Sequence, residues 1–74
     1  SRPMMAVNYG LRLMSRDANT PVARRIATDL QDPDKFRALM SLPQGHPTRK
    51  MAEEVLLKAT VGTMLNPPEE ERFQ

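Results

Sequence analysis

TPVARRIATDLQDP, residues 20–33, decides how this chain folds. The stretch holds two copies of one device, Thr20-Pro21 and Asp32-Pro33, in which an oxygen-bearing side chain precedes a proline. Such a side chain accepts a hydrogen bond from an early helix N–H, and proline suits the first helical position because it has a fixed φ and no N–H. Apolar residues at helical spacing follow the first copy: Val22, Ile26 and Leu30. The stretch therefore predicts a capped helix over 21–30.

Two further prolines follow a polar or ring side chain, at His46-Pro47 and Asn66-Pro67. The four dipeptides predict a helix over 33–42 and a longer one over 47–65, which Asn66-Pro67 ends. The apolar arc of the longer helix is wide, so we expect this helix to be central. One expected line on it runs through Met51, Val55, Ala59 and Gly62. Its small residues, Ala59, Gly62 and Thr63, should let another helix approach closely.

Residues 3–16 fit two structures. A helix would place Met4, Val7, Leu11 and Met14 in one stripe, whereas a strand would alternate Val7, Tyr9, Leu11 and Leu13 with polar residues. Gly10 is unfavourable in both, by roughly 0.5–1 kcal/mol in a helix. We choose the helix because the chain offers no second strand, and an isolated strand is not stable. If the segment is a strand, its partner lies in another chain.

These elements predict an all-α fold, a small bundle of three short helices and one longer C-terminal helix. Residues 1–66 form the helical domain, and residues 67–74 form an acidic C-terminal tail. The side chains expected to be buried together sit in the middle of their stripes: Ile26, Phe36, Leu39, Val55, Leu56 and Ala59.

The composition indicates a domain that is stabilised by contact with the rest of a longer chain or with other subunits. A chain of 74 residues buries only about 60% of the surface that its unfolded form exposes. It has six methionines, three aromatic residues and no cysteine. Methionine is flexible, so it specifies one packing weakly and suits a surface that adapts to a partner.

We see no signal-peptide pattern and expect no membrane span, and the localisation stays open between the cytoplasm and a viral particle.

The charges are unevenly distributed along the chain. The net charge is +2, but residues 1–28 carry +4 and residues 51–74 carry −3. This asymmetry suggests either head-to-tail association or an electropositive contact face at the front of the chain.

No constellation of residues carries chemistry. His46 is the only histidine, and we interpret it as a loop residue near a helix N-terminus. Asp29, Asp32 and Asp34 lack the glycine and the distant Glu of a calcium loop. Three glycines build no phosphate cradle. We therefore predict no catalytic residue, no cofactor-binding residue, no metal site and no cofactor, and we expect that the chain is not an enzyme.

Four arginines at the front of the chain are candidates for contact with an anion or an acidic partner: Arg12, Arg16, Arg24 and Arg25. Two short helices joined by a tight turn resemble the outline of a helix-turn-helix. The helix over 33–42, however, offers few polar side chains that read bases, and Asp34 stands at the end that would meet the DNA. A small basic nucleic-acid-binding domain is therefore the alternative interpretation.

Our preferred interpretation is a non-enzymatic helical module for protein–protein interaction and assembly. It would be a fragment or small subunit of a larger structural assembly, viral or other, whose partner is the chain itself or another subunit. The apolar side chains that exceed the need of one small core are the expected interface: Met4, Met5, Leu13, Met14, Leu57, Val61, Met64 and Leu65.

Overall fold

The computed structural model describes the backbone of residues 2–65 and the side chains of residues 7–65. This part of the chain forms four helices and no strand: α1 (Arg2–Asp17), α2 (Pro21–Asp29), α3 (Pro33–Met40) and α4 (Pro47–Leu65). The predicted all-α bundle with the longest helix at its C-terminal side is confirmed. The strand alternative for 3–16 is wrong, since these residues lie within α1. The predicted tail lies outside the described residues.

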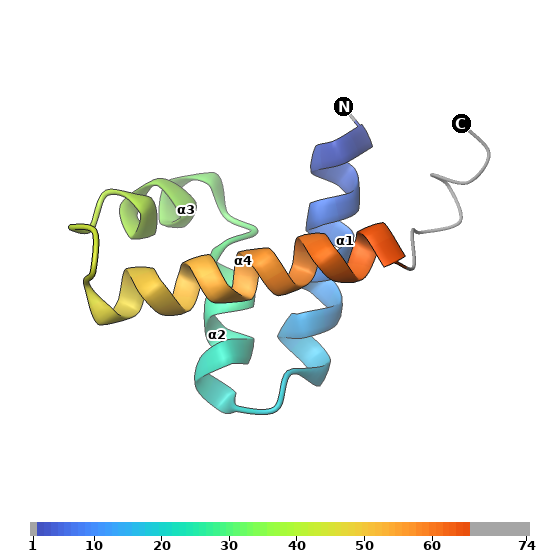
Figure 1. Cartoon of the computed structure of the whole chain (residues 1–74), viewed down its shortest axis with the longest axis horizontal. Coiled ribbons are helices and arrows are strands. Elements are labelled where there is room, and N and C mark those ends of the chain that lie inside the picture. Colours follow the sequence, from blue (N-terminus) through green and yellow to red (C-terminus); the bar gives the residue numbers. More distant parts are fainter. Residues whose placement is uncertain (1, 66–74) are drawn as a thin grey trace.

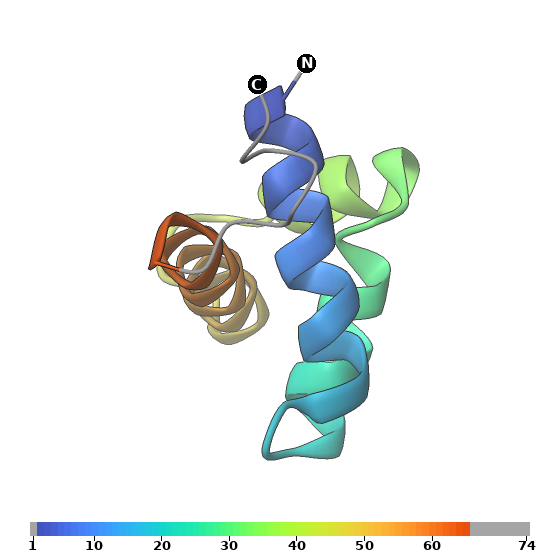
Figure 2. The same ribbon diagram turned by 90° about the vertical axis from the view of Figure 1, so that its right-hand side faces the viewer.

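The helices are arranged around a crossing of α1 and α4. Helices α1 and α2 form an antiparallel pair, and α4 crosses α1 at a steep angle (Figure 1). The three other helices all pack against α4, with α3 beside its N-terminal half. Seen from the side, α4 lies on one face of α1 and α2 (Figure 2). Helix α4 thus contacts all three other helices, but the expected central position is only partly found, because most of its residues are exposed and, within the described residues, one side of it has no helix packed on it.

The helix starts follow from local chemistry. Thr20 Oγ1 accepts a hydrogen bond from the N–H of Ala23 at 3.1 Å, and Asp32 Oδ1 accepts one from the N–H of Asp34 at 2.9 Å. Before α4, His46 Nδ1 accepts from the N–H of Thr48 at 3.1 Å. Each acceptor satisfies an N–H that has no partner inside its helix. The cap-and-proline prediction is confirmed for these three helices, and His46 is a capping residue.

The crossing of α1 and α4 requires a glycine. A Cβ atom added to Gly10 would lie 2.6 Å from the backbone oxygen of Ala59 and 3.0 Å from Cγ2 of Thr63. Only a residue without a side chain allows the two backbones to approach this closely. The close approach expected at Ala59 and Thr63 is thus found. Gly62 takes no part in it, because a Cβ added there meets nothing within 4 Å.

The core lies where α1, α2 and α4 meet. Its buried apolar residues are Leu11, Ile26, Ala27, Leu30, Ala52, Val55 and Ala59. The prediction is right for Ile26, Val55 and Ala59. It is wrong for Phe36, Leu39 and Leu56, which are only partly buried against this cluster.

The difference follows from the length and place of α3. This helix has eight residues, none of them buried, and it packs beside α4 away from the crossing. On α4 itself the buried line is Ala52, Val55, Ala59 and Thr63. Two residues of the expected line, Met51 and Gly62, are therefore exposed.

Replacing Leu11 by Ala should destabilise the domain more than replacing Phe36 by Ala. Leu11 is 1% exposed, so its truncation leaves a cavity, and we expect a loss of about 2–5 kcal/mol in the free energy of unfolding. Phe36 loses only part of its contact area, and we expect about 1–2 kcal/mol. Urea unfolding of both variants measures the order, and a costlier Phe36 variant would place the core at α3.

Two glycine-to-alanine variants should move stability in opposite directions. Gly10→Ala forces a Cβ against Ala59, and we expect a net loss of about 1–3 kcal/mol because the backbones must separate. Gly62→Ala adds a Cβ in open space within a helix, and we expect a gain of about 0.5–1 kcal/mol. Thermal unfolding measures both, and equal shifts of one sign would contradict the crossing described above.

Candidate functional site

Four of the eight predicted interface residues lie together on the outward side of α4. Leu57 is 62% exposed, Val61 44%, Met64 76% and Leu65 75%. Their spacing of i, i+4, i+7 and i+8 places them on one face of the helix. We call these four residues the α4 ridge.

The other four predicted interface residues are placed differently. Leu13 and Met14 are half-buried on α1, where Met14 packs against the core. Met4 and Met5 belong to α1, but their side chains lie outside the described residues. The expected single surface is therefore represented, among the described side chains, by the α4 ridge and by two residues on the neighbouring helix.

The ridge is exposed because α4 is apolar on two opposite sides. One side carries the buried line that faces α1 and α2. The charged residues of the helix lie between Arg49 and Lys58, and its last seven residues, 59–65, carry no charge. A helix that is apolar all round is normally buried all round. Among the described residues, only one side of the C-terminal half of α4 is covered.

An apolar groove lies next to α4, on the side of α3. It has a volume of about 480 Å³. Its apolar lining comes from all four segments around it: Val7, Leu11, Leu30, Pro33, Phe36 and Leu56. Its polar lining comes from Asn8, Gln31, Arg37 and Thr60. We call this the α3 groove.

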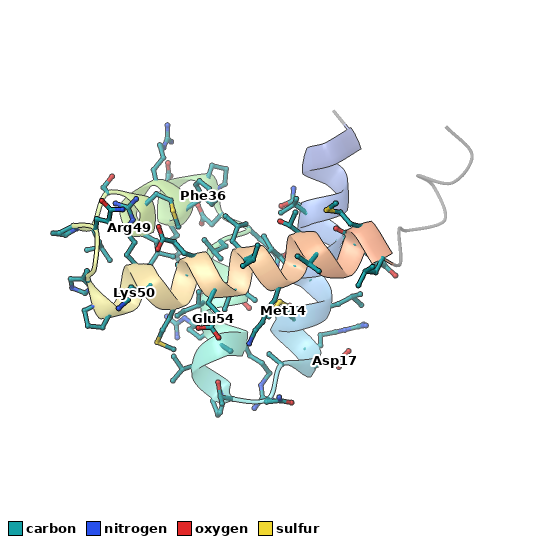
Figure 3. The ribbon with its side chains drawn as sticks, in the orientation of Figure 1. Met14, Asp17, Phe36, Arg49, Lys50 and Glu54 are labelled. Carbon is teal, nitrogen blue, oxygen red and sulfur yellow. The ribbon has the colours of Figure 1, made fainter. Side chains whose placement is uncertain are left out.

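The α3 groove was missed at the level of sequence. Phe36 and Leu56 were expected inside the core, and their partial burial is what leaves the groove open. Phe36 lies above α4 and Met14 below it in Figure 3, and each of these side chains lines a hollow beside the helix. The signal that predicts the groove is the shortness of the 33–42 segment, which cannot cover the apolar residues of three neighbours.

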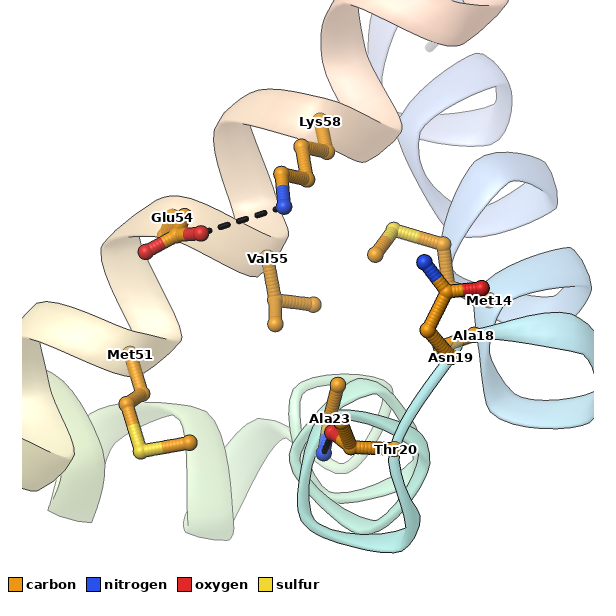
Figure 4. Close-up of a pocket in the computed structure, with 9 residues that line it drawn as sticks. All are labelled: Met14, Ala18, Asn19, Thr20, Ala23, Met51, Glu54, Val55 and Lys58. Carbon is orange, nitrogen blue, oxygen red and sulfur yellow. Dashed lines mark hydrogen bonds and ion pairs between the residues drawn. The ribbon is translucent and has the colours of Figure 1, made fainter.

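A second hollow lies below α4, between this helix and the turn from α1 to α2. It has a volume of about 350 Å³, and Met14, Met51 and Val55 form much of its wall (Figure 4). At its edge Lys58 Nζ lies 3.1 Å from Glu54 Oε1, an ion pair between residues four apart on the helix. This hollow presents apolar side chains and one exposed ion pair, so a ligand would be bound there mainly through apolar contacts.

The four predicted arginines do not form one patch. Arg24 Nη1 donates to the backbone oxygen of Ala18 at 2.9 Å, just beyond the end of α1. Arg25 lies 3.4 Å from Asp29 Oδ1. Arg12 lies over the ring of Tyr9, 5.9 Å from its centroid. Arg12 and Arg16 remain together on the exposed side of α1.

The remaining polar candidates have structural partners. Asp32 caps α3, Asp34 lies 2.7 Å from Arg37, and Asp29 lies within 4 Å of both Arg25 and Lys35. Within residues 2–65 no group of three or more His, Asp or Glu side chains could hold a metal ion. The described helices also include none with the length and apolar character needed to cross a membrane.

Comparisons of the chain with protein-family models, with curated proteins and with solved structures find no match. The function is therefore argued from the geometry of the chain itself.

Adjacent arginines give a test of these placements. Arg24→Ala should lower the free energy of unfolding by about 1–2 kcal/mol, because the half-buried carbonyl of Ala18 loses a charged donor. Arg25→Ala should change it by less than about 0.5 kcal/mol, because the Arg25 side chain is 75% exposed and solvent screens its pair with Asp29. In a domain of this size 1 kcal/mol moves the melting temperature by about 4–8 °C, so calorimetry separates the two variants.

Proposed function

We propose that this chain is a non-enzymatic helical module that binds protein, and that it serves as a small subunit or segment of a larger assembly. The observation that carries the proposal is the α4 ridge. It comprises four large apolar side chains on one face of one helix, each between 44% and 76% exposed.

The size and continuity of the ridge support a protein partner. Single exposed apolar residues are ordinary on any protein surface. A contiguous set, flanked by hollows whose linings are also largely apolar, is typical of an interaction surface. Covering the ridge would remove apolar area from water, which is the main favourable term in association.

The surroundings of the ridge fit the same function. On the α1 side a smaller hollow of about 250 Å³ runs from Gly62 to Tyr9 and Leu13. Arg12 and Arg16 lie at the outer edge of this region, beside Tyr9. Interfaces commonly have an apolar centre rich in Met and aromatic residues and a polar rim. In the proposed function Arg12 and Arg16 form such a rim or meet an acidic partner surface.

The nucleic-acid alternative has weaker support from the geometry. Of the four front arginines, Arg24 is bound to a carbonyl and Arg25 is beside an aspartate. Arg12 and Arg16 alone provide few phosphate contacts, and among the described residues Tyr9 is the aromatic ring beside them. Strong binding to nucleic acid normally combines many such contacts with stacking rings.

Photo-crosslinking at matched positions tests the function. A photo-reactive amino acid replaces Val61 on the ridge or, as a control, Val22 on α2, which is 52% exposed and lies off the ridge. In the cells that make the protein, position 61 should give discrete protein adducts and position 22 should not.

Two results would contradict the proposal. One is equal labelling from positions 61 and 22, which would mean that the ridge is ordinary surface. The other is binding to DNA or RNA that falls steeply with salt and is lost when Arg12 and Arg16 are both replaced by Ala, since such behaviour reports phosphate contacts.

A further inference from the structure

An apolar hollow and a cationic hollow adjoin on α1. The first is the hollow of about 250 Å³ between α1 and α4, and we call it the α1–α4 hollow. The second has a volume of about 420 Å³ and is lined by Arg12, Ser15 and Arg16, and we call it the arginine hollow. Tyr9 and Leu13 line both hollows. A ligand that lies across these two side chains therefore contacts apolar and cationic groups at once.

The arginines of this surface have no acidic partner among the described side chains. Arg12 and Arg16 are exposed, and no carboxylate of residues 7–65 lies within 4 Å of either guanidinium. Asp17 follows Arg16 in the chain, but it lines neither hollow. Other described cations do lie within 4 Å of a carboxylate: Arg25, Lys35, Arg37, Arg49 and Lys58. Arg12 and Arg16 thus give this surface positive charge that no described carboxylate pairs with.

The two guanidinium groups suit a pair of carboxylates. Arg12 lies over the ring of Tyr9, 5.9 Å from its centroid. An aromatic face takes up none of the N–H donors of arginine, and these donors match the two oxygens of a carboxylate. Arg12 and Arg16 stand four residues apart on one helix, a spacing at which Cβ atoms are about 5–6 Å apart. Two carboxylates separated by one turn of a second helix have the same spacing.

Gly62 leaves the α1–α4 hollow open. A Cβ atom added to it would meet nothing within 4 Å, so packing within the described residues does not require a glycine there. In a helix interior glycine is less favourable than alanine. What the missing side chain provides is space, through which a bound segment can approach the backbone of α4 closely. Val61 of the ridge precedes Gly62, and Leu65 follows about one turn later, so a segment in the hollow also borders the ridge.

We propose that the α1–α4 hollow and the arginine hollow together bind an acidic amphipathic helix of another protein. Its apolar side chains enter the α1–α4 hollow, and two of its carboxylates, one turn apart, pair with Arg12 and Arg16. This inference rests on the proposed function and states the chemistry of the partner. The observations favour a peptide, because a nucleic acid carries anions with few aliphatic groups, and a flat lipid surface does not fill a hollow.

NMR titration of the full chain tests the proposal with a defined probe. The probe is a short alanine-rich helix that carries two leucines and, on the adjoining face, two glutamates one turn apart. In the control peptide both glutamates are glutamines. The glutamate peptide should shift the amide signals of residues 9–16 and 58–65 more than the others. The glutamine peptide should bind more weakly by about fivefold or more, because it forms neither ion pair.

Two double variants with the same change in net charge test the arginines. Arg12→Gln with Arg16→Gln should abolish the preference for the glutamate peptide. Arg25→Gln with Lys50→Gln changes exposed positions outside both hollows and should retain it. Gly62→Leu fills the α1–α4 hollow, so it should weaken the binding of both peptides severalfold. Its melting temperature should not fall, because leucine is a better helix former than glycine, and the loss of binding is then not a loss of folding.

Several results would overturn the proposal. One is equal binding of the two peptides, and another is equal loss of the preference in both double variants. A third is binding of phosphatidylserine vesicles through the two arginines without binding of either peptide, which would make the ligand a lipid. The last is a shift of the signals of residues 9–16 with the concentration of the chain alone, or on replacing Glu69, Glu70 and Glu71 by Gln. The occupant would then be a second copy or the chain's own carboxylates.

The proposed function and this inference fail separately. If position 61 is labelled by another protein in cells while the glutamate peptide is not preferred, the acidic helix is wrong and the interaction function stands. If position 61 is labelled no more than position 22, the proposed function is wrong and the inference falls with it.

Discussion

The contact of Gly10 with Ala59 and Thr63 is the constraint on which the rest of this structure depends. It brings the backbones of α1 and α4 so close that no side chain fits between them at this point. The close approach lets small residues contribute to a core that would otherwise need larger ones. Ala27, Ala52 and Ala59 are almost completely buried, and Leu11 is the largest fully buried side chain. A domain with few aromatic residues can in this way still exclude water from its centre.

The same crossing determines which apolar residues are left over. Because α4 packs on α1 and α2 through one narrow line of small residues, its larger residues, Leu57, Val61, Met64 and Leu65, point elsewhere. The side of α4 that carries small side chains contributes to the core, and the side that carries large side chains faces outward. Helix α3 cannot cover that side, because it has eight residues and lies beside the other half of α4. The exposed ridge and the open groove are thus two results of one packing arrangement.

Local chemistry made much of the fold predictable from the sequence. Thr20, Asp32 and His46 act on N–H groups two or three residues away, so their effect can be inferred without a structure. The burial of side chains could not be inferred in this way. Phe36 lies on the apolar stripe of its helix, yet its burial depends on whether α3 reaches the crossing, which is a property of the whole fold. Leu11 was on an expected stripe, but nothing local marks it as the centre.

In the candidate site, too, some features were predictable from the sequence and others depended on the tertiary structure. That α4 carries more apolar residues than one core needs is visible in the sequence, because residues 59–65 have no charge. The short 33–42 segment indicates only that its neighbours are incompletely covered; the lining of the α3 groove was not predictable, since it comes from four segments that only the tertiary structure assembles. Arg24 was also misplaced among the surface cations. Its bond to the carbonyl of Ala18 joins α2 to the end of α1, and no pattern of charges reveals such a bond.

The prolines at the starts of α2, α3 and α4 have a consequence for the unfolded chain. Pro21, Pro33 and Pro47 each fix φ near the helical value whether or not the protein is folded. The residue before each of them is restricted as well. The unfolded ensemble therefore has fewer conformations to lose at the three points where helices begin. Part of the stability of this small domain therefore comes from the lowered conformational entropy of its unfolded state.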